Sequence, residues 1–265
     1  MPIRRTLSLR DLTQPEFDTL DAIVMRHAYA SQNKFGRMFD ERVYENDLAQ
    51  RLRGEGFEVH TQVPVSVLHG TFEKTYFLDL VVNQMLYELK TVAALLAEHQ
   101  AQGLHYAMLR DIRRVKLLNF RSAKVQGDLV YNAVTEAGRH AAQFCTDRWR
   151  PLSDACPRLV ALVRSLVADC GTHLSSRLYN GALVHCLGGE EACLQRIAVS
   201  DSMTTLGTHM VQFHGPGIGF VVTAITRHTD EHRRHLQCLL DHLALKGIQW
   251  INFNHAQVEL RTLTR

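Results

Sequence analysis

The sequence predicts an α/β protein, an α+β sandwich of two tandem domains, each with a mixed central sheet flanked by helices. Three observations predict this fold class. Helical periodicity alternates with short runs rich in β-branched residues. The first half of the chain has the order helix, three strands, helix, strand. The second half repeats that order, with similar short stretches at corresponding places.

The first half opens with two helical patterns. Residues 14–36 place Phe17, Leu20 and Val24 on one face, and residues 40–56 end at two glycines, a usual signal for a helix C-terminus. Strand-like runs and one further helix come next. The expected strands are 57–68, 74–82 and 85–92, the helix is 94–111, and the closing strand is 113–120.

Similar stretches in the two halves indicate an internal repeat. The three pairs, in order, are 36–56 with 171–191, the segment from Glu98 with that from Glu231, and the segment from Leu118 with that from Ile251. The last two pairs share one offset of 133 residues, which chance matches rarely do. We therefore expect a first domain over residues 1–136, a joint near 135–150 and a second domain over 150–265.

Composition restricts the cell compartment and the kind of partner. The chain is 46% apolar and 22% charged, with a formal net charge of only +3, so any surface for nucleic acid must be local. No apolar run reaches the roughly 18 residues of a membrane span, and the N-terminus lacks the apolar region of a secretory signal. All six cysteines lie at or beyond Cys145 without C-x-x-C spacing. These features favour a cytoplasmic protein with reduced, mostly buried thiols and no membrane contact.

The stretch FLDLVVNQMLYELK, residues 77–90, contains charges within two strand-like runs. A symmetric hairpin with its turn at Asn83 and Gln84 places Asp79 opposite Glu88, with Cβ atoms about 4.5–5.5 Å apart. Two carboxylates so placed repel unless a divalent cation lies between them. Lys90 shares a face with Glu88 and stands beside that position. The alternative is a solvated strand face, and Asn-Gln is not a favoured hairpin pair, so a longer loop is also open.

These residues resemble the PD-(D/E)XK nuclease signature, and the surrounding sequence resembles one branch, the GxxExxY proteins. The matching features lie in order over roughly residues 20–125: Glu41 and Tyr44 in E-x-x-Y, QVP from Gln62, Asp79, the ELK of Glu88, Leu89 and Lys90, HQAQ from His99 to Gln102, and LLNF from Leu117. One departure is Met38, which stands where the motif has glycine. The resemblance implies a restriction-endonuclease-like fold in both domains.

The resemblance also implies roles for individual residues. Asp79 and Glu88, with the backbone carbonyl of Leu89, would bind Mg²⁺ or Mn²⁺, and Lys90 would orient the attacking water and stabilise charge. Glu41 would assist at the edge of the metal site, directly or through water, and Gln102 would contact the site or the phosphate. For His99 a capping or packing role is as plausible as a functional one.

A basic stretch, RDIRRVKLLNFRSAK, is the candidate surface for the nucleic-acid backbone. Its basic residues are Arg110, Arg113, Arg114, Lys116, Arg121 and Lys124. A solvated basic surface around one strand is the alternative reading, and no aromatic platform for stacking single strands is evident.

The second half lacks the charged pattern. Glu41 corresponds to Ser176, Asp79 to a position near Gln212, Glu88 to one near Val221, and Lys90 to one near Thr223. Residues 209–226 contain no acid, so we expect no hard-cation site and interpret this half as a degenerate pseudo-nuclease copy. It would complete a dimer-like pair, widen the substrate groove or bind a protein partner.

The second half is instead rich in histidine. His228, His232 and His235 lie on one helical face, but the first and last are about 10.5 Å apart along the axis, too far for one zinc ion. We expect paired surface histidines rather than zinc. Cys186 and Cys193 are expected in the core, and HGPGIGF, residues 214–220, is expected to form a turn or hairpin tip.

The sequence therefore predicts a Mg²⁺-dependent nuclease that hydrolyses phosphodiester bonds of nucleic acid, with DNA the favoured class. A catalytically vestigial module that binds nucleic acid or protein is the alternative, and a zinc protein built on the histidines is the weakest option. A monomer whose two copies form an internal pseudo-dimer is favoured.

Overall fold

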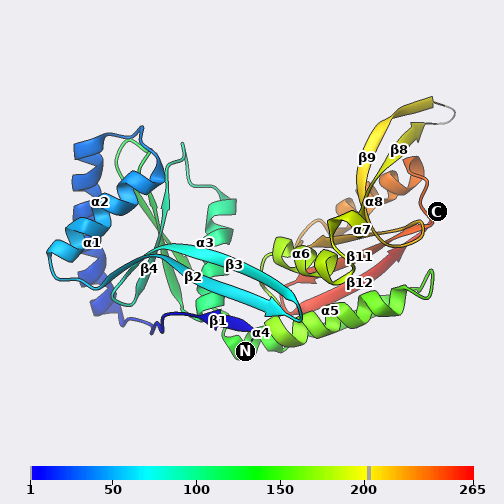
Figure 1. Ribbon diagram of the computed structural model, residues 1–265, viewed down its shortest axis with the longest axis horizontal. Helices are drawn as coiled ribbons and strands as arrows, with labels where there is room; N and C mark the ends of the chain where they lie inside the picture. The colour runs from blue at the N-terminus through cyan, green and yellow to red at the C-terminus, as the bar shows by residue number, and fades with distance from the viewer. Residues whose placement is uncertain (1, 202–203) are drawn as a thin grey trace. The chain divides into compact units, whose positions relative to one another are not determined.

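The computed structural model describes residues 2–201 and 204–265, and these form two compact units. The N-terminal unit comprises residues 3–67 and 74–135. The C-terminal unit comprises residues 136–265 together with Pro2 and residues 68–73, the tip of a hairpin. Each unit is built on a six-stranded mixed sheet with helices on its faces (Figure 1). The mixed α/β fold class predicted from the sequence is confirmed.

The N-terminal sheet has the order β1-β2-β3-β4-β5-β6. β4 pairs antiparallel with β3 and parallel with β5, and β5 pairs antiparallel with β6. The strands are β1 (Ile3–Arg5), β2 (Val59–His69), β3 (Phe72–Val82), β4 (Met85–Lys90), β5 (Arg114–Asn119) and β6 (Gln126–Tyr131). The helices are α1 (Gln14–Phe35), α2 (Glu41–Gly54) and α3 (Ala97–Arg110).

The helices of this unit form a layer on each side of the sheet. Apolar side chains of α1 and α2, such as Val24 and Leu48, pack with Leu80 and Tyr87 in one buried cluster. On the other face Gly103 of α3 meets β5, since a Cβ there would lie 3.1 Å from the side chain of Leu117. Glycine therefore lets α3 approach the sheet closely, and the end of β4 lies between the two helical layers.

The hairpin of β3 and β4 has the predicted register. Leu80 pairs with Tyr87 and Val82 with Met85, so the turn is the two-residue one at Asn83 and Gln84. Asn83 adopts a left-handed backbone with φ of 50°, which asparagine tolerates better than most residues. Its backbone N–H donates to the Glu58 backbone carbonyl at 2.8 Å, and its side-chain Oδ1 accepts from the Glu58 backbone N–H at 3.1 Å. These bonds explain how an unfavoured turn sequence is held.

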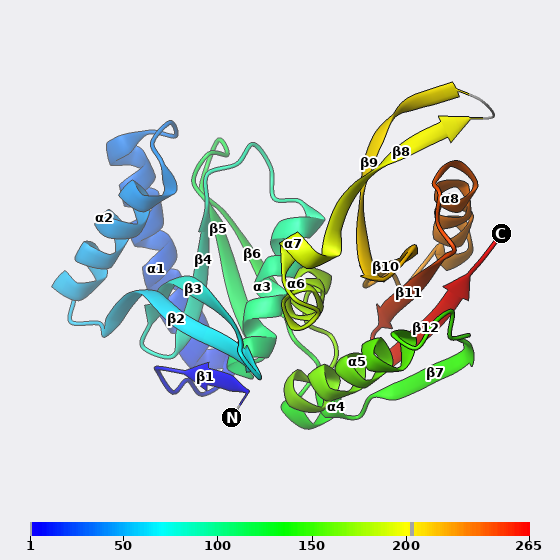
Figure 2. The same ribbon diagram turned by 45° about the vertical axis from the view of Figure 1, so that its right-hand side comes forward.

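The C-terminal sheet has the order β7-β12-β11-β10-β9-β8. Its strands are β7 (Gln143–Arg148), β8 (Leu194–Asp201), β9 (Thr204–Gly215), β10 (Ile218–Thr223), β11 (Gly247–Asn254) and β12 (Gln257–Leu263). The helices are α4 (Glu136–His140), α5 (Cys156–Cys170), α6 (Ser176–Cys186), α7 (Glu190–Cys193) and α8 (Thr229–His242). The β8–β9 hairpin extends beyond the rest of its sheet (Figure 2).

The two sheets share one topology from β2 to β6 and from β8 to β12. β4 pairs antiparallel with β3 and parallel with β5, and β10 pairs in the same way with β9 and β11. β5 then pairs antiparallel with β6, as β11 does with β12. The strand-to-strand register also agrees. Lys90 lies opposite Asn119 in the first sheet, and Thr223 lies opposite Asn252 in the second, at the offset of 133 residues found in the sequence.

Side-chain contacts repeat between the units as well. The Tyr44 hydroxyl donates to the Gly36 carbonyl at 2.8 Å, and the Tyr179 hydroxyl donates to the Gly171 carbonyl at 2.8 Å. Both tyrosine rings also stack on a phenylalanine. Tyr44 stacks on Phe120, just after β5, with ring centroids 4.6 Å apart, and Tyr179 stacks on Phe253, within β11, with centroids 3.8 Å apart.

Three further expectations concern the rest of the chain. The segment HGPGIGF forms the end of β9, a turn at Pro216 and Gly217, and the start of β10, as predicted. All six cysteines are free, but Cys145 and Cys238 are exposed, so burial of the thiols is only partial. None of the helices in residues 2–201 and 204–265 combines the length and apolar character that a membrane crossing requires.

Candidate active site

The candidate site lies where β3 and β4 cease to pair. Leu80 and Tyr87 are the last paired residues of this ladder, and Asp79 and Glu88 are the next residue on each strand. The Asp79 side chain reaches across the opening, where its Oδ2 accepts a hydrogen bond from the backbone amide of Leu89 at 2.8 Å. The opening therefore brings a carboxylate from each strand to one place, as the register predicts.

Glu88 is the most buried of these charged groups, at 2% exposure. Its Oε1 accepts hydrogen bonds from Lys90 Nζ at 2.7 Å and from Gln102 Nε2 at 2.8 Å. Its Oε2 is buried and has no hydrogen-bond partner among the described residues. Burial, and then the negative charge of Asp79, raise the pKa of Glu88 to about 8, although Lys90 partly opposes the shift.

Lys90 is the cation of the site. Its Nζ donates to Glu88 Oε1 and to the backbone carbonyl of Leu89, both at 2.7 Å. Burial alone lowers the pKa of Lys90, but the nearby acids Glu88, Glu41 and Asp79 outweigh burial and raise it overall. The ammonium group is therefore charged at neutral pH and contacts the two groups expected to bind a metal.

Helix α3 supplies Gln102 from the opposite layer. Besides its bond to Glu88, Gln102 Nε2 lies 3.0 Å from the Tyr106 hydroxyl, one turn further along α3. His99 instead caps the helix, since its Nδ1 accepts from the backbone amide of Leu96 at 2.8 Å. Of the two roles left open for His99, the capping contact is the one observed.

Glu41 is the first residue of α2 and faces the same charges. Burial raises its pKa to about 7, with Asp79 and Glu45 adding to the shift and Lys90 opposing it. Met38, which replaces the motif glycine, is 81% exposed in the turn before the helix. The substitution therefore leaves Glu41 at the start of α2, directed toward the acids and the lysine.

Two residues that the sequence analysis did not select support the site. Gln62 Nε2 donates to Glu45 Oε2 at 2.7 Å and lies 3.4 Å from Asp79 Oδ1. Gln62 holds this position with a backbone φ of 52°, unusual for a residue other than glycine. Glu45 is buried and also pairs with Arg42 at 2.9 Å. The QVP run marks Gln62 as a motif residue, but only the fold reveals which side chains its amide contacts.

The donor set fits a hard divalent cation. Two carboxylates and one backbone carbonyl, from Asp79, Glu88 and Leu89, are the oxygen ligands that Mg²⁺ and Mn²⁺ prefer. The unpaired Glu88 Oε2 supplies a buried acceptor that still lacks a partner. Among the described residues no group of three or more histidine, cysteine or acidic side chains is arranged around one point, so water or phosphate oxygens would complete the coordination.

The basic stretch divides into two parts that lie at opposite ends of β5. Arg113 and Arg114 lie where β5 begins, and because β5 runs parallel to β4, Arg114 is about 16 Å along the sheet from the level of Lys90. Arg121 and Lys124 are exposed in the loop after β5, beyond Asn119, which lies opposite Lys90.

Two of the predicted backbone-binding residues are not on the surface. Arg110 is 3% exposed, and its guanidinium donates to the backbone carbonyl of Leu7. The Lys116 side chain is 12% exposed and pairs with Asp21 at 2.9 Å. Burial of Arg110 and Lys116 against residues remote in sequence gives no support to the predicted nucleic-acid contact of these two side chains.

The corresponding place in the C-terminal unit has no acids. Val221 occupies the Glu88 position and Thr223 the Lys90 position, where the Thr223 hydroxyl donates to Asn252 and accepts from Trp250 Nε1. A bulge shifts β9 by one residue, because Gly215 pairs with Ile218 but Phe213 pairs with Gly219. The counterpart of Asp79 is therefore Val211, one residue from the predicted Gln212.

In this unit His228, His232 and His235 lie near an acid or a tryptophan. Among the described residues no cluster of three metal-ligating side chains occurs there. His228 Nδ1 and His235 Nε2 instead lie 3.7 Å and 3.9 Å from the carboxylate of Glu231. His232 packs near the Trp250 ring, with centroids 5.2 Å apart. His228 and His235 are thus exposed beside an acid, whereas His232 is half-buried.

Comparison with known proteins agrees with this geometry. Residues 18–130 match the family model of the PD-(D/E)XK nuclease superfamily. No curated protein and no solved structure matches the chain. The matched segment contains all of the side chains described above around Asp79, Glu88 and Lys90. Residues 18–130, less than half of the chain, are therefore similar to the PD-(D/E)XK nuclease superfamily.

Proposed function

We propose that the N-terminal unit is a Mg²⁺- or Mn²⁺-dependent nuclease that hydrolyses phosphodiester bonds of nucleic acid, with DNA the favoured substrate. The observation that carries the proposal is the buried Glu88 carboxylate, which has one oxygen without a partner and stands beside Asp79 at the strand opening. A structural role alone would not keep two buried acids side by side, because desolvation and repulsion both destabilise the fold.

Each residue has a distinct part in the proposed reaction. Asp79, Glu88 and the Leu89 carbonyl would hold the metal. The bound ion would act as a Lewis acid on a phosphoryl oxygen and lower the pKa of a water molecule. Lys90 would orient that water and offset charge that develops on the phosphate.

The remaining side chains hold the ligands in position. Gln102 fixes Glu88 Oε1 through its 2.8 Å hydrogen bond, and Oε2, which has no hydrogen-bond partner among the described residues, would be available to bind the metal. Gln62 restrains the other carboxylate, Asp79, and Glu41 borders the site from α2. Arg121 and Lys124, at the same end of the sheet as Lys90, would hold the nucleic-acid backbone.

For the C-terminal unit we infer a duplicated copy of the same fold that has lost the chemistry. Equal strand topology, the shared offset of 133 residues and the repeated tyrosine contacts support duplication. Valines in place of both acids argue against hydrolysis there. A chain that only binds nucleic acid or a protein partner is the second candidate function, and this apolar replacement is the observation that favours it.

Cleavage of labelled single- and double-stranded DNA and RNA separates the two candidates. Each substrate is incubated with Mg²⁺, Mn²⁺ or EDTA, using the wild-type chain beside Asp79→Ala and Lys90→Ala. The proposal expects metal-dependent cutting of at least one substrate by the wild type alone. Binding of a substrate without cutting under every condition would support the binding module and contradict the nuclease.

A further inference from the structure

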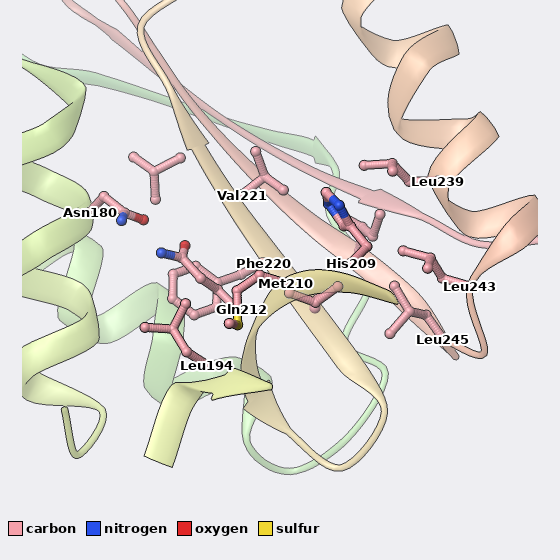
Figure 3. A pocket seen from close by; sticks show the side chains of 14 residues that line it. Asn180, Leu194, His209, Met210, Gln212, Phe220, Val221, Leu239, Leu243 and Leu245 are labelled. Carbon is pink, nitrogen blue, oxygen red and sulfur yellow. The ribbon is translucent and has the colours of Figure 1, made fainter. Parts of the chain in front are cut away.

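The C-terminal unit contains a cavity of about 380 Å³ that the nuclease chemistry does not use (Figure 3). Side chains from α6, β8, β9, β10, α8 and β11 line it. Its polar groups are the carboxamides of Asn180 and Gln212 and the imidazole of His209. The volume lies within the range of small-molecule sites in proteins, about 300–1,000 Å³.

The cavity opens where β9 and β10 separate. Phe213 and Gly219 form the last pair of this ladder, and the lining residues of both strands, such as Val211 and Val221, lie beyond it. The N-terminal unit separates β3 from β4 one pair further along the corresponding ladder, after Leu80 and Tyr87, and places Asp79 and Glu88 there. The C-terminal unit thus has the same opening between strands, with valines where the acids would be.

The lining determines what kind of molecule can enter. None of the described residues that line the cavity is an aspartate, glutamate, lysine or arginine, so the lining offers an ion no carboxylate, ammonium or guanidinium partner. Phe220, Leu239 of α8 and Leu243, which follows that helix, give apolar walls. A ligand with a neutral, largely apolar body is favoured.

The two carboxamides add a directional requirement. Figure 3 shows the amide groups of Asn180 and Gln212 turned toward each other on one side of the cavity, away from Leu239, Leu243 and Leu245. Each carboxamide presents one acceptor and two donor hydrogens. Together they match a molecule that carries neighbouring donors and acceptors along one edge.

We propose that this cavity binds a nucleobase, held at its hydrogen-bonding edge by Asn180 and Gln212 and packed against Phe220. A base combines an uncharged aromatic body with an edge of alternating donors and acceptors, whereas the sugar and phosphate can remain outside in water. The C-terminal unit then recognises an unpaired base of a nucleic acid without cutting it. This inference does not depend on the nuclease activity of the N-terminal unit.

Tryptophan fluorescence offers a direct test in the full chain. The chain has two tryptophans, Trp149 and Trp250, and Trp250 lies opposite Val221 of the cavity lining in the β10–β11 ladder. In a Trp149→Phe background with EDTA present, adenosine, guanosine, cytidine and uridine are titrated in turn. Ribose 5-phosphate, which has no base, is the comparison ligand.

The expected result is a saturable change in Trp250 emission with at least one nucleoside and none with ribose 5-phosphate. Gln212→Leu and Asn180→Leu are each expected to weaken that affinity at least tenfold, and Val221→Phe, which fills the cavity, should abolish it. Gln195→Leu removes an exposed amide from β8 outside this cavity and should leave the affinity unchanged.

Three results would overturn the proposal. Nucleosides that do not bind would remove the ligand class. Equal binding of ribose 5-phosphate would indicate an anion site elsewhere. Binding that Gln212→Leu and Asn180→Leu leave intact would show that the carboxamides do not read the ligand, and a purely apolar pocket would replace the nucleobase site.

Discussion

At the scale of single residues, the candidate site keeps charges in a place that disfavours them. Glu88 and Asp79 are buried beside each other, and Lys90 provides a positive charge in contact with Glu88. The raised pKa of Glu88, about 8, reflects burial first and the neighbouring acid second. A bound divalent cation would offset both the burial of the Glu88 carboxylate and its repulsion by Asp79. Metal binding should therefore stabilise the folded chain.

Metal binding can be measured without any substrate. At a Mn²⁺ concentration about 100 times its dissociation constant, binding should stabilise the wild-type chain by about 2.7 kcal/mol. Glu88→Gln, which removes the charged ligand, should show no such stabilisation in thermal unfolding. Glu98→Gln on the exposed face of α3 is the control and should respond like the wild type. Equal stabilisation of Glu88→Gln would place the metal elsewhere.

Gln62 provides a second prediction at this scale. Its left-handed backbone, with φ of 52°, strains any side chain other than glycine, at a cost of about 1 kcal/mol. Gln62→Ala and Gln62→Gly both lose the contacts to Glu45 and Asp79, but only glycine relieves the strain. Urea unfolding should therefore give Gln62→Gly the higher free energy of unfolding, by about 1 kcal/mol. Equal stabilities would show that the backbone there is unstrained.

At the scale of elements, the site depends on how the end of β4 is held. Asn119 of β5 is fully buried, and its side chain exchanges two hydrogen bonds with the backbone of Val92, at 3.1 Å and 2.8 Å. Asn252 of β11 makes the same pair of bonds to Ile225, at 2.8 Å and 2.9 Å. In the first unit this clamp fixes the chain just after Lys90.

The two clamps allow a matched comparison. Asn119→Ala and Asn252→Ala each leave part-buried backbone groups of Val92 or Ile225 without these partners, and each should lower the free energy of unfolding of its unit by about 2 kcal/mol. Only Asn119→Ala should also weaken Mn²⁺ binding, because only that clamp adjoins acids. Chemical unfolding and Mn²⁺ calorimetry of both variants check this, and equal metal affinity in the two would contradict the positioning role of the β4 end.

The loop after β5 should carry the backbone contacts that the start of β5 does not. Each phosphate contact adds about 0.9 to the dependence of log affinity on log salt for duplex DNA. In the Lys90→Ala background, Arg121→Ala with Lys124→Ala should lower that slope by about 2, measured by fluorescence anisotropy. Arg113→Ala with Arg114→Ala should leave it unchanged. A larger effect from the second pair would reverse the assignment.

The sequence was sufficient for the features that strict periodicities encode. Alternation along 77–90 predicted the strand register, and the spacing of Asp79, Glu88 and Lys90 predicted which side chains meet. Burial of Arg110 was missed because its partner, Leu7, is remote in sequence. The bulge in β9 made Val211, and not the predicted Gln212, the counterpart of Asp79. The contacts of Gln62 depend on a left-handed backbone, which the residue pattern does not indicate.

At the scale of the whole molecule, one topology occurs twice with two different openings. In the N-terminal unit the opening between strands is lined by acids and a lysine, and in the C-terminal unit by valines and carboxamides. The charged side chains of the N-terminal opening favour a metal cation and a phosphate, whereas the neutral lining of the C-terminal opening favours a nucleobase. We therefore propose that any cleavage belongs to the N-terminal unit alone.

The most direct test is the cleavage rate of the preferred substrate with saturating Mg²⁺, compared between Lys90→Met and Thr223→Val, which alter equivalent positions of the two units. Circular dichroism confirms that both variants are folded. We predict that Lys90→Met lowers the cleavage rate at least about 100-fold, because it removes a group that stabilises charge in the transition state. Thr223→Val should keep the rate within about twofold of the wild type. A folded Lys90→Met chain that cuts as fast as the wild type would contradict the account.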